Sequence, residues 1–150
     1  MDKQKLQEEL RKSMLKRDEL KTSVLRLLLS AINYYEIAKG GAGYEASKED
    51  VLLVIQNQAK QRRDSIEEFK KAQRQELVDK ETKELEILQK YLPEQMNEEE
   101  ISKLVREAIS QTNASSITDM GKVMGVLMPK VKGKADGNLV SKIVKENLTG

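Results

Sequence analysis

Apolar residues recur along the chain at the three- and four-residue steps of an α-helix, and no stretch alternates as a β-strand would. The first stripe predicts a helix that falters near residues 16–18, and a second helix follows over residues 18–39. In the second helix the apolar residues occupy two sides, so we expect it to be central and covered. The two sides carry Leu20, Val24, Leu27, Leu28, Ala31 and Tyr35, and Leu25, Leu29 and Ile32.

Turn and capping residues divide the first part of the chain into four helices. The glycines of residues 40–43 break the second helix. Ser47 with Asp50 three residues later forms a near capping box that starts a long third helix. A fourth helix from about residue 74 is ended by Pro93, because the residue before a proline avoids helical geometry.

The rest of the chain predicts three shorter helices. Asn97 with Glu100 caps the first of them, and Ser116 with Asp119 opens the second. Asp136 is placed to cap the third. We therefore predict an all-α protein, with an N-terminal four-helix part over residues 1–92 and a C-terminal three-helix domain over residues 97–150.

Two glycines stand inside the sixth predicted helix. Gly121 and Gly125 lie one turn apart on its flank, beside Lys122. A glycine costs about 1 kcal/mol relative to alanine in a helix interior, so two of them suggest close approach to the backbone. We expect a neighbouring helix to pack there first, and a ribose-phosphate backbone lying along the row to be the second use of the same space.

The segment after this helix is basic. Pro129 should end or kink the helix near Met128 and leave a loop that leads into the last helix. Such a loop, next to a helix N-terminus, is a candidate phosphate-binding edge, although a solvated loop with chance basic character is the alternative. Its candidate RNA-binding residues are Lys130, Lys132, Gly133 and Lys134.

Charge is sorted within the C-terminal domain. Residues 93–150 hold eight Lys and Arg against eight Asp and Glu, but most of the acidic residues come early and most of the lysines late. Arg62 and Arg63, on the third helix, are secondary candidates for phosphate or for acidic partners. Surface pairing with Asp64 or Glu67 is the alternative for them.

Composition limits the possible chemistry. The chain has no cysteine and no histidine, which removes thiolate chemistry, the usual general base and the commonest metal ligand. The glycine-rich residues 40–43 lack the spacing of a phosphate-binding loop. The serine pair at residues 115–116 is explained by helix capping. We therefore predict no catalytic residue, no metal and no cofactor.

Two further function classes are disfavoured. With one phenylalanine, four tyrosines and no tryptophan, the chain is a poor platform for stacking single-stranded bases. No apolar run approaches the length of a membrane span, and the N-terminus is charged where a signal peptide would be apolar. We expect a cytoplasmic protein without a membrane partner.

The sequence resembles the GatB/YqeY family of small bacterial proteins, and resembles its YqeY-type members over essentially the whole chain. The resemblance is carried by ASSITDMGKVMGVLMPKVKGKADGNLVSKIVKENL, KQRRDSIEEFKKAQRQEL and EILQKYLPEQMNEEEI. The residues that match the family pattern are Asp119, Gly121, Lys122, Gly125, Gly133, Lys134, Ala135 and Asp136. The related pattern commonly has proline at the place of Gly137, so the last helix should start less rigidly here.

This resemblance implies a link to tRNA. The distal domain of the family is similar to the tail domain of the B subunit of the tRNA-dependent amidotransferase, which makes Asn-tRNA and Gln-tRNA, and that tail is understood to contact tRNA. It implies tRNA as a partner, with amidotransferase or aminoacyl-tRNA synthesis proteins as further possible partners. The synthetic part of that subunit, with its metal and nucleotide sites, has no counterpart in 150 residues.

Three functions stay open at this point. The first is a non-catalytic tRNA-binding accessory protein. The second, which family descriptions imply, is a component of a carbon–nitrogen ligase with glutamine as amido donor. The third is a protein-interaction module without an RNA role, which would use the charged third helix or the methionines of the sixth helix. An RNA module needs exposed lysines gathered on one surface, whereas a docking module needs an exposed apolar patch.

Overall fold

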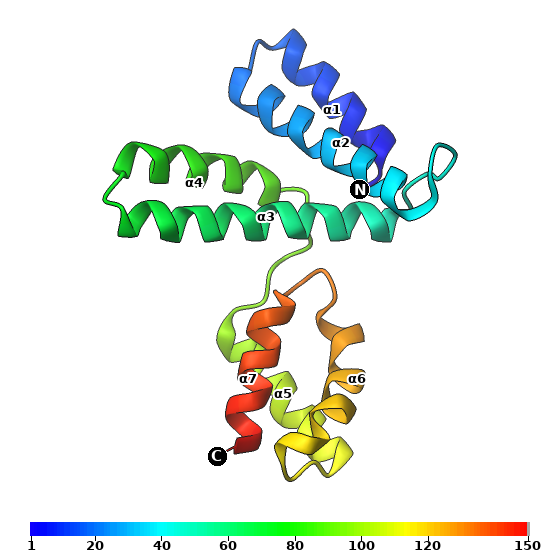
Figure 1. Ribbon diagram of the computed structural model, residues 1–150, viewed down its shortest axis with the longest axis vertical. Coiled ribbons are helices and arrows are strands. Elements are labelled where there is room, and N and C mark those ends of the chain that lie inside the picture. Colours follow the sequence, from blue (N-terminus) through cyan, green and yellow to red (C-terminus); the bar gives the residue numbers. More distant parts are fainter. Residues whose placement is uncertain (150) are drawn as a thin grey trace. The chain divides into compact units, whose positions relative to one another are not determined.

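A computed structural model describes residues 1–149 of the chain. Within this range the regular structure consists of seven α-helices and one short 3-10 turn, which confirms the all-α prediction (Figure 1). The chain divides into two compact units, Met1–Leu92 and Pro93–Gly150. None of the helices in residues 1–149 combines the length and the apolar character needed to cross a membrane.

The N-terminal unit is built from two helical hairpins. The helix bounds are α1 Lys3–Leu15, α2 Glu19–Gly40, α3 Lys48–Lys71 and α4 Gln75–Gln89. In Figure 1 α1 lies along α2, and α4 lies along α3. Their facing sides bury one apolar cluster, whose members are Leu6, Val24, Leu25, Leu28, Ile32, Val51, Val54, Ile55 and Leu88.

Capping side chains form hydrogen bonds at the starts of α2 and α3. Asp18 caps α2 by accepting a hydrogen bond from the Lys21 N–H at 3.1 Å. Ser47 and Asp50 form both bonds of the capping box at the start of α3. Such caps satisfy N–H groups that have no partner within the helix and are worth about 1 kcal/mol each.

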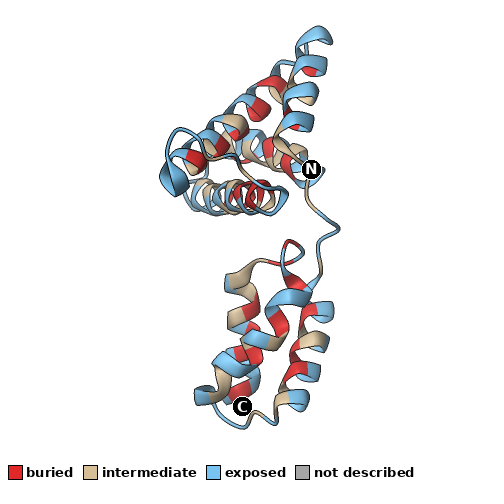
Figure 2. Ribbon diagram, turned by 90° about the vertical axis from the view of Figure 1, so that its right-hand side faces the viewer, coloured by how far each residue is buried: buried red, intermediate tan, exposed pale blue. Residues whose placement is uncertain are grey.

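The expectation that α2 is covered on two sides holds except at Leu27, which is about half exposed, whereas the other predicted positions are buried or half-buried. Tyr34 and Ile37, which lie outside those two sides, are more exposed still. Figure 2 shows exposed positions along the N-terminal helices beside the buried ones. Because α1, α3 and α4 together cover only part of α2, an apolar stripe of this helix stays open to solvent.

The C-terminal unit packs three helices around a second core. The bounds are α5 Glu98–Thr112, η1 Ile117–Asp119, α6 Met120–Val131 and α7 Gly137–Thr149. Asn97 with Glu100 and Ser116 with Asp119 form capping boxes at α5 and η1, as the sequence predicts. The core residues are Ile101, Val105, Ala108, Val123, Leu127, Val131, Ala135, Val140, Ile143, Val144 and Leu148.

Pro129 does not end α6 where the sequence predicts. The helix continues through Pro129 to Val131, and the Lys132 N–H donates to the Met128 carbonyl at 2.9 Å. A proline fits in this last turn because only one intrahelical bond is lost there. Since proline has no N–H, the carbonyl of Gly125 lacks its usual donor four residues on.

The segment before α5 holds the segment after α6 in place. The Met96 N–H donates to the Lys134 carbonyl at 2.8 Å, and the Gln95 side chain donates to the Gly133 carbonyl at 3.0 Å. These bonds fix the backbone of residues 133–134 from outside their own helix pair. The backbone that carries the exposed side chain of Lys134 is therefore fixed by residues 95–96.

Candidate functional site

The solvent face of α6 is open along its two glycines. We call it the glycine face, and its exposed members are Gly121, Lys122, Gly125, Met128, Pro129 and Lys130. A methyl group built on either glycine would meet no atom within 4 Å. The packing explanation for these glycines is therefore wrong. The side of α6 that faces the core lies opposite the two glycines and carries Val123 and Leu127, which are fully buried.

The candidate lysines border this face or follow it. Lys122, Lys130 and Lys134 are exposed, and none of them forms an ion pair within residues 1–149. Lys132 is exposed as well. On a helical wheel Lys122 and Lys130 stand about 80° apart, and both lie to the same side of the row formed by Gly121 and Gly125. The glycine face thus carries positive charge along one edge.

Lys122 also lies near the carboxylate that starts the helix. Asp119 accepts hydrogen bonds from the Ser115 and Ser116 N–H groups at 3.1 and 3.4 Å. These bonds lower the pKa of the Asp119 carboxyl, and the nearby Lys122 ammonium lowers it further. Asp119 is therefore a capping residue, and one negative charge stands at the start of the face.

The turn between α6 and α7 separates structural from accessible residues. Gly133 is buried with φ 79°, a conformation that favours glycine, so its role is conformational. Ala135 lies in the core. Asp136 accepts from the Asn138 N–H at 3.1 Å at the start of α7. Of this part of the matched pattern, only the Lys134 side chain is exposed.

The two secondary candidates on α3, Arg62 and Arg63, differ in their contacts. Arg62 pairs with Glu81 at 3.0 Å and with Glu84 at 2.9 Å, both on α4, and its side chain is mostly buried. Neither Asp64 nor Glu67 is its partner, contrary to the sequence-based alternative. Arg63 is half-buried and forms no ion pair within residues 1–149. Arg62 is thus engaged in joining two helices and is not available to a phosphate.

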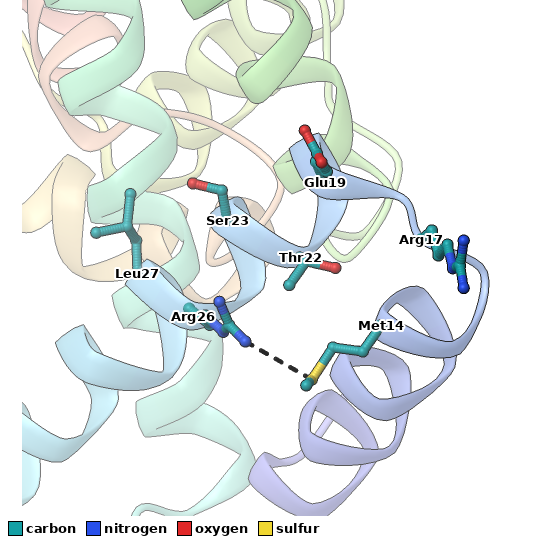
Figure 3. Close-up of a pocket in the computed structure, with 7 residues that line it drawn as sticks. All are labelled: Met14, Arg17, Glu19, Thr22, Ser23, Arg26 and Leu27. Carbon is teal, nitrogen blue, oxygen red and sulfur yellow. Dashed lines mark hydrogen bonds between the residues drawn. The ribbon is translucent and has the colours of Figure 1, made fainter.

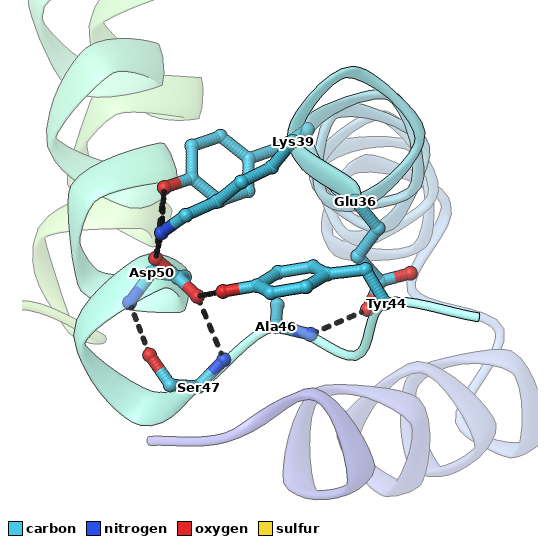
Figure 4. Close-up of polar contacts among 7 residues, drawn as sticks. Glu36, Lys39, Tyr44, Ala46, Ser47 and Asp50 are labelled. Atoms are coloured by element: carbon cyan, nitrogen blue, oxygen red, sulfur yellow. Dashed lines mark hydrogen bonds and ion pairs between the residues drawn. The ribbon is translucent and has the colours of Figure 1, made fainter. Parts of the chain in front are cut away.

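A polar cluster in the N-terminal unit surrounds Asp50 (Figure 4). Its carboxylate accepts from the hydroxyls of Tyr35 and Tyr44 at 2.8 and 2.5 Å, from Lys39 Nζ at 2.9 Å and from the Ser47 N–H at 3.0 Å. The bond from Tyr44, followed by those from Lys39 and Ser47, holds the pKa of Asp50 far below its usual range. The bond to Asp50 raises the pKa of Lys39.

Further bonds beside this cluster hold the glycine-rich loop between α2 and α3 in place. Glu36 accepts from the Ala46 N–H at 2.9 Å and from Lys3 Nζ at 2.8 Å, so the loop is tied to α2 as well as to α3. All of these charges have partners within the unit. We interpret the cluster as a structural anchor, and within residues 1–149 no group of three His, Cys, Asp or Glu could hold a metal ion.

Comparison with known proteins covers nearly the whole chain. A family profile described as Yqey-like protein matches residues 3–148. The chain belongs to the YqeY-like family. The family resemblance read from the matched pattern is thereby confirmed.

The chain is also similar to fungal proteins named altered inheritance of mitochondria protein 41, mitochondrial. The one from Pyrenophora tritici-repentis is 41% identical over 96 residues, which is 62% of this chain and 52% of that protein. The one from Saccharomyces cerevisiae is 41% identical over 88 residues, 58% of this chain and 46% of that protein. This YqeY-like chain therefore spans about half the length of these relatives.

The open glycine face makes a prediction about stability. Gly125→Ala is expected to stabilise the C-terminal unit by about 1 kcal/mol, because the new methyl meets no atom and the helix loses a flexible residue. Hydrogen exchange at the Val123 and Leu127 amides of the full chain reports the opening free energy of this helix. As an opposite control, Gly41→Ala, at φ 73°, should destabilise its own unit. Faster exchange at these amides in Gly125→Ala would contradict the prediction and would mean that the added methyl clashes with a neighbouring group.

Proposed function

We propose that this member of the YqeY-like family is a non-catalytic accessory protein that binds tRNA through its C-terminal unit. The observation that carries the proposal is the glycine face of α6. Its backbone is uncovered at Gly121 and Gly125, and Lys122 and Lys130 border it without ion pairs. An extended polyanion can approach such a helix closely and place its phosphates beside the ammonium groups.

The chemistry of this contact is that of phosphate binding. Residues 93–150 contain no aromatic side chain, so bases have no ring to stack on in this unit. Lysine ammonium groups bind phosphate as point charges and carry little sequence information. The proposed contact therefore fixes the position of a folded RNA rather than reading its sequence. Selectivity among tRNAs would have to come from shape or from a partner protein.

Fewer observations support a carbon–nitrogen ligase role or a particular cellular location. A role in glutamine-dependent carbon–nitrogen ligation would need amidotransferase or aminoacyl-tRNA synthesis proteins as partners, and no residue of this chain is assigned a catalytic part. The name of the fungal relatives refers to mitochondria and describes those proteins. A cytoplasmic location stays a prediction for this chain.

Salt dependence tests the proposal. If Lys122, Lys130 and Lys134 each neutralise one phosphate, affinity for tRNA should fall about 20- to 40-fold between about 50 and 200 mM salt. Gel shift or filter binding with the full chain and total tRNA measures this slope. Binding that is absent at low salt, or that does not change with salt, would overturn the proposal.

A further inference from the structure

We propose that the α1–α2 hairpin carries a docking surface for an acidic amphipathic helix of a partner protein. The surface is separate from the glycine face, and the proposal does not depend on RNA binding. It consists of a pocket at the tip of the hairpin and an exposed apolar stripe along α2. We call it the hairpin surface, and its residues are Met14, Arg17, Arg26, Leu27, Tyr34 and Ile37.

The pocket lies where α1 ends and α2 begins (Figure 3). It has a volume of about 570 Å³ and is lined by Met14, Arg17, Glu19, Thr22, Ser23, Arg26 and Leu27. Met14 and Leu27 are each 49% exposed, so apolar groups are open to solvent here. Figure 3 shows the Arg26 side chain directed toward Met14, whose sulfur lies 4.0 Å from an Arg26 nitrogen.

The apolar stripe continues along α2 away from the pocket. Tyr34 is 75% exposed and Ile37 is 63% exposed. On a helical wheel Leu27, Tyr34 and Ile37 fall within an arc of about 80°, and they span about 15 Å along the axis. Large apolar groups at i, i+7 and i+10 are the spacing that a second helix can follow for about three turns.

The charge at the tip selects the sign of the partner. Residues 11–26 hold six Lys and Arg against two Asp and Glu. Lys12 and Lys21 are paired with Glu9, whereas the remaining four cations form no ion pair within residues 1–149. These four are Arg11, Lys16, Arg17 and Arg26. Glu19 also lines the pocket and opposes them, which leaves a net positive charge beside the exposed apolar groups of Met14 and Leu27.

The mixture of side chains favours a protein helix over RNA. RNA bases stack on aromatic rings or guanidinium planes, which Tyr34, Arg17 and Arg26 also offer here. The other exposed groups are a thioether and two aliphatic side chains, Met14, Leu27 and Ile37, which bases do not use. Thioether and aliphatic groups match leucine or methionine anchors of a partner helix. The arginines of the hairpin surface can pair with carboxylates on the flanks of that helix. The sequence-based docking hypothesis used α3 or the α6 methionines, where Leu53 and Met128 are exposed, and α2 carries a longer exposed apolar stripe.

Methionine-methyl NMR of the full chain tests the proposal. The probe is a synthetic helical peptide with leucines on one face and glutamates along its flanks, compared with a scrambled peptide of equal composition. Met14 reports the hairpin surface, and Met128, which is 38% exposed in the other unit, is the internal control. The helical peptide should shift the Met14 signal saturably and leave Met128 unchanged.

Four outcomes would overturn the proposal. The Met14 signal does not respond to the helical peptide, or it responds equally to the scrambled one, which would indicate charge alone. It shifts with tRNA as strongly as with the peptide, which would make the surface an RNA contact. It shifts with protein concentration in the absence of peptide, which would make the partner a second copy of this chain.

Arg17 offers a variant that should not unfold the protein. Its φ is 56°, a conformation that favours glycine, so Arg17→Gly relieves backbone strain while removing the charge. Affinity for the helical peptide should fall about three- to tenfold, as for loss of a charged contact at an interface. Gln73→Gly, also at φ 56° between α3 and α4, is the matched control and should bind like the parent chain. Equal affinity of Arg17→Gly and the control would contradict the assignment of the rim.

Discussion

Replacing Arg62 by methionine is expected to lower the free energy of unfolding of the N-terminal unit by about 3 kcal/mol, the low end of the range for breaking a buried ion pair. Arg62 connects α3 to α4 through Glu81 and Glu84, and Glu84 is buried. Methionine keeps much of the aliphatic volume of the arginine. The loss therefore arises chiefly from leaving two carboxylates without their cation.

Tyrosine fluorescence during urea unfolding measures this effect in one unit, because all four tyrosines lie within residues 1–92. Arg63→Met is the matched control. It removes the same charge from the neighbouring position, where no ion pair is broken, and should cost less than about 0.5 kcal/mol. Adding Glu84→Met to Arg62→Met should restore part of the loss. Equal stabilities for the two single variants would show that the ion pairs contribute nothing.

Changing Lys122, Lys130 and Lys134 together to glutamine is expected to weaken tRNA binding by about a hundredfold near 0.2 M salt and to reduce the salt slope by about 2 to 2.7. The reason is that each lysine is exposed and forms no ion pair, so each is free to release a counterion from a phosphate. Glutamine keeps a polar side chain of similar reach at each position. The measurement is the tRNA titration at several salt concentrations.

The matched control changes three exposed lysines of the other unit. Lys80, Lys83 and Lys90 lie on or directly after α4 and form no ion pair within residues 1–149. Their replacement by glutamine alters the net charge by the same amount. If this control weakens binding as much as the first triple does, the contact is a property of total charge, and the assignment to the C-terminal unit is wrong.

Local rules account for most of the helical framework. Ser47 with Asp50 and Asn97 with Glu100 set helix starts through bonds between neighbours, so their pattern is readable in sequence. The wheel of α6 also separates buried Val123 and Leu127 from the exposed glycines. These features depend on residues a few positions apart, where helix geometry fixes the distances in advance.

The errors arise where distant segments decide the outcome. Arg62 finds its partners 19 and 22 residues away because α3 and α4 form a hairpin, and no local pattern distinguishes Glu81 or Glu84 from other glutamates. The uncovered sides of α2 and α6 depend in the same way on where other helices end. A periodic pattern identifies apolar and glycine positions, and it cannot say whether another helix reaches them.

The path of α6 through Pro129 has a consequence for how its last turn is held. Because proline has no N–H, the Gly125 carbonyl loses its usual donor, and the proline ring crowds the place where that donor would be. The final turn therefore depends on the bond from the Lys132 N–H to the Met128 carbonyl and on the packing of Val131, which is fully buried. Lys130 thus stands on a helix end secured by the core rather than by a complete ladder of main-chain bonds.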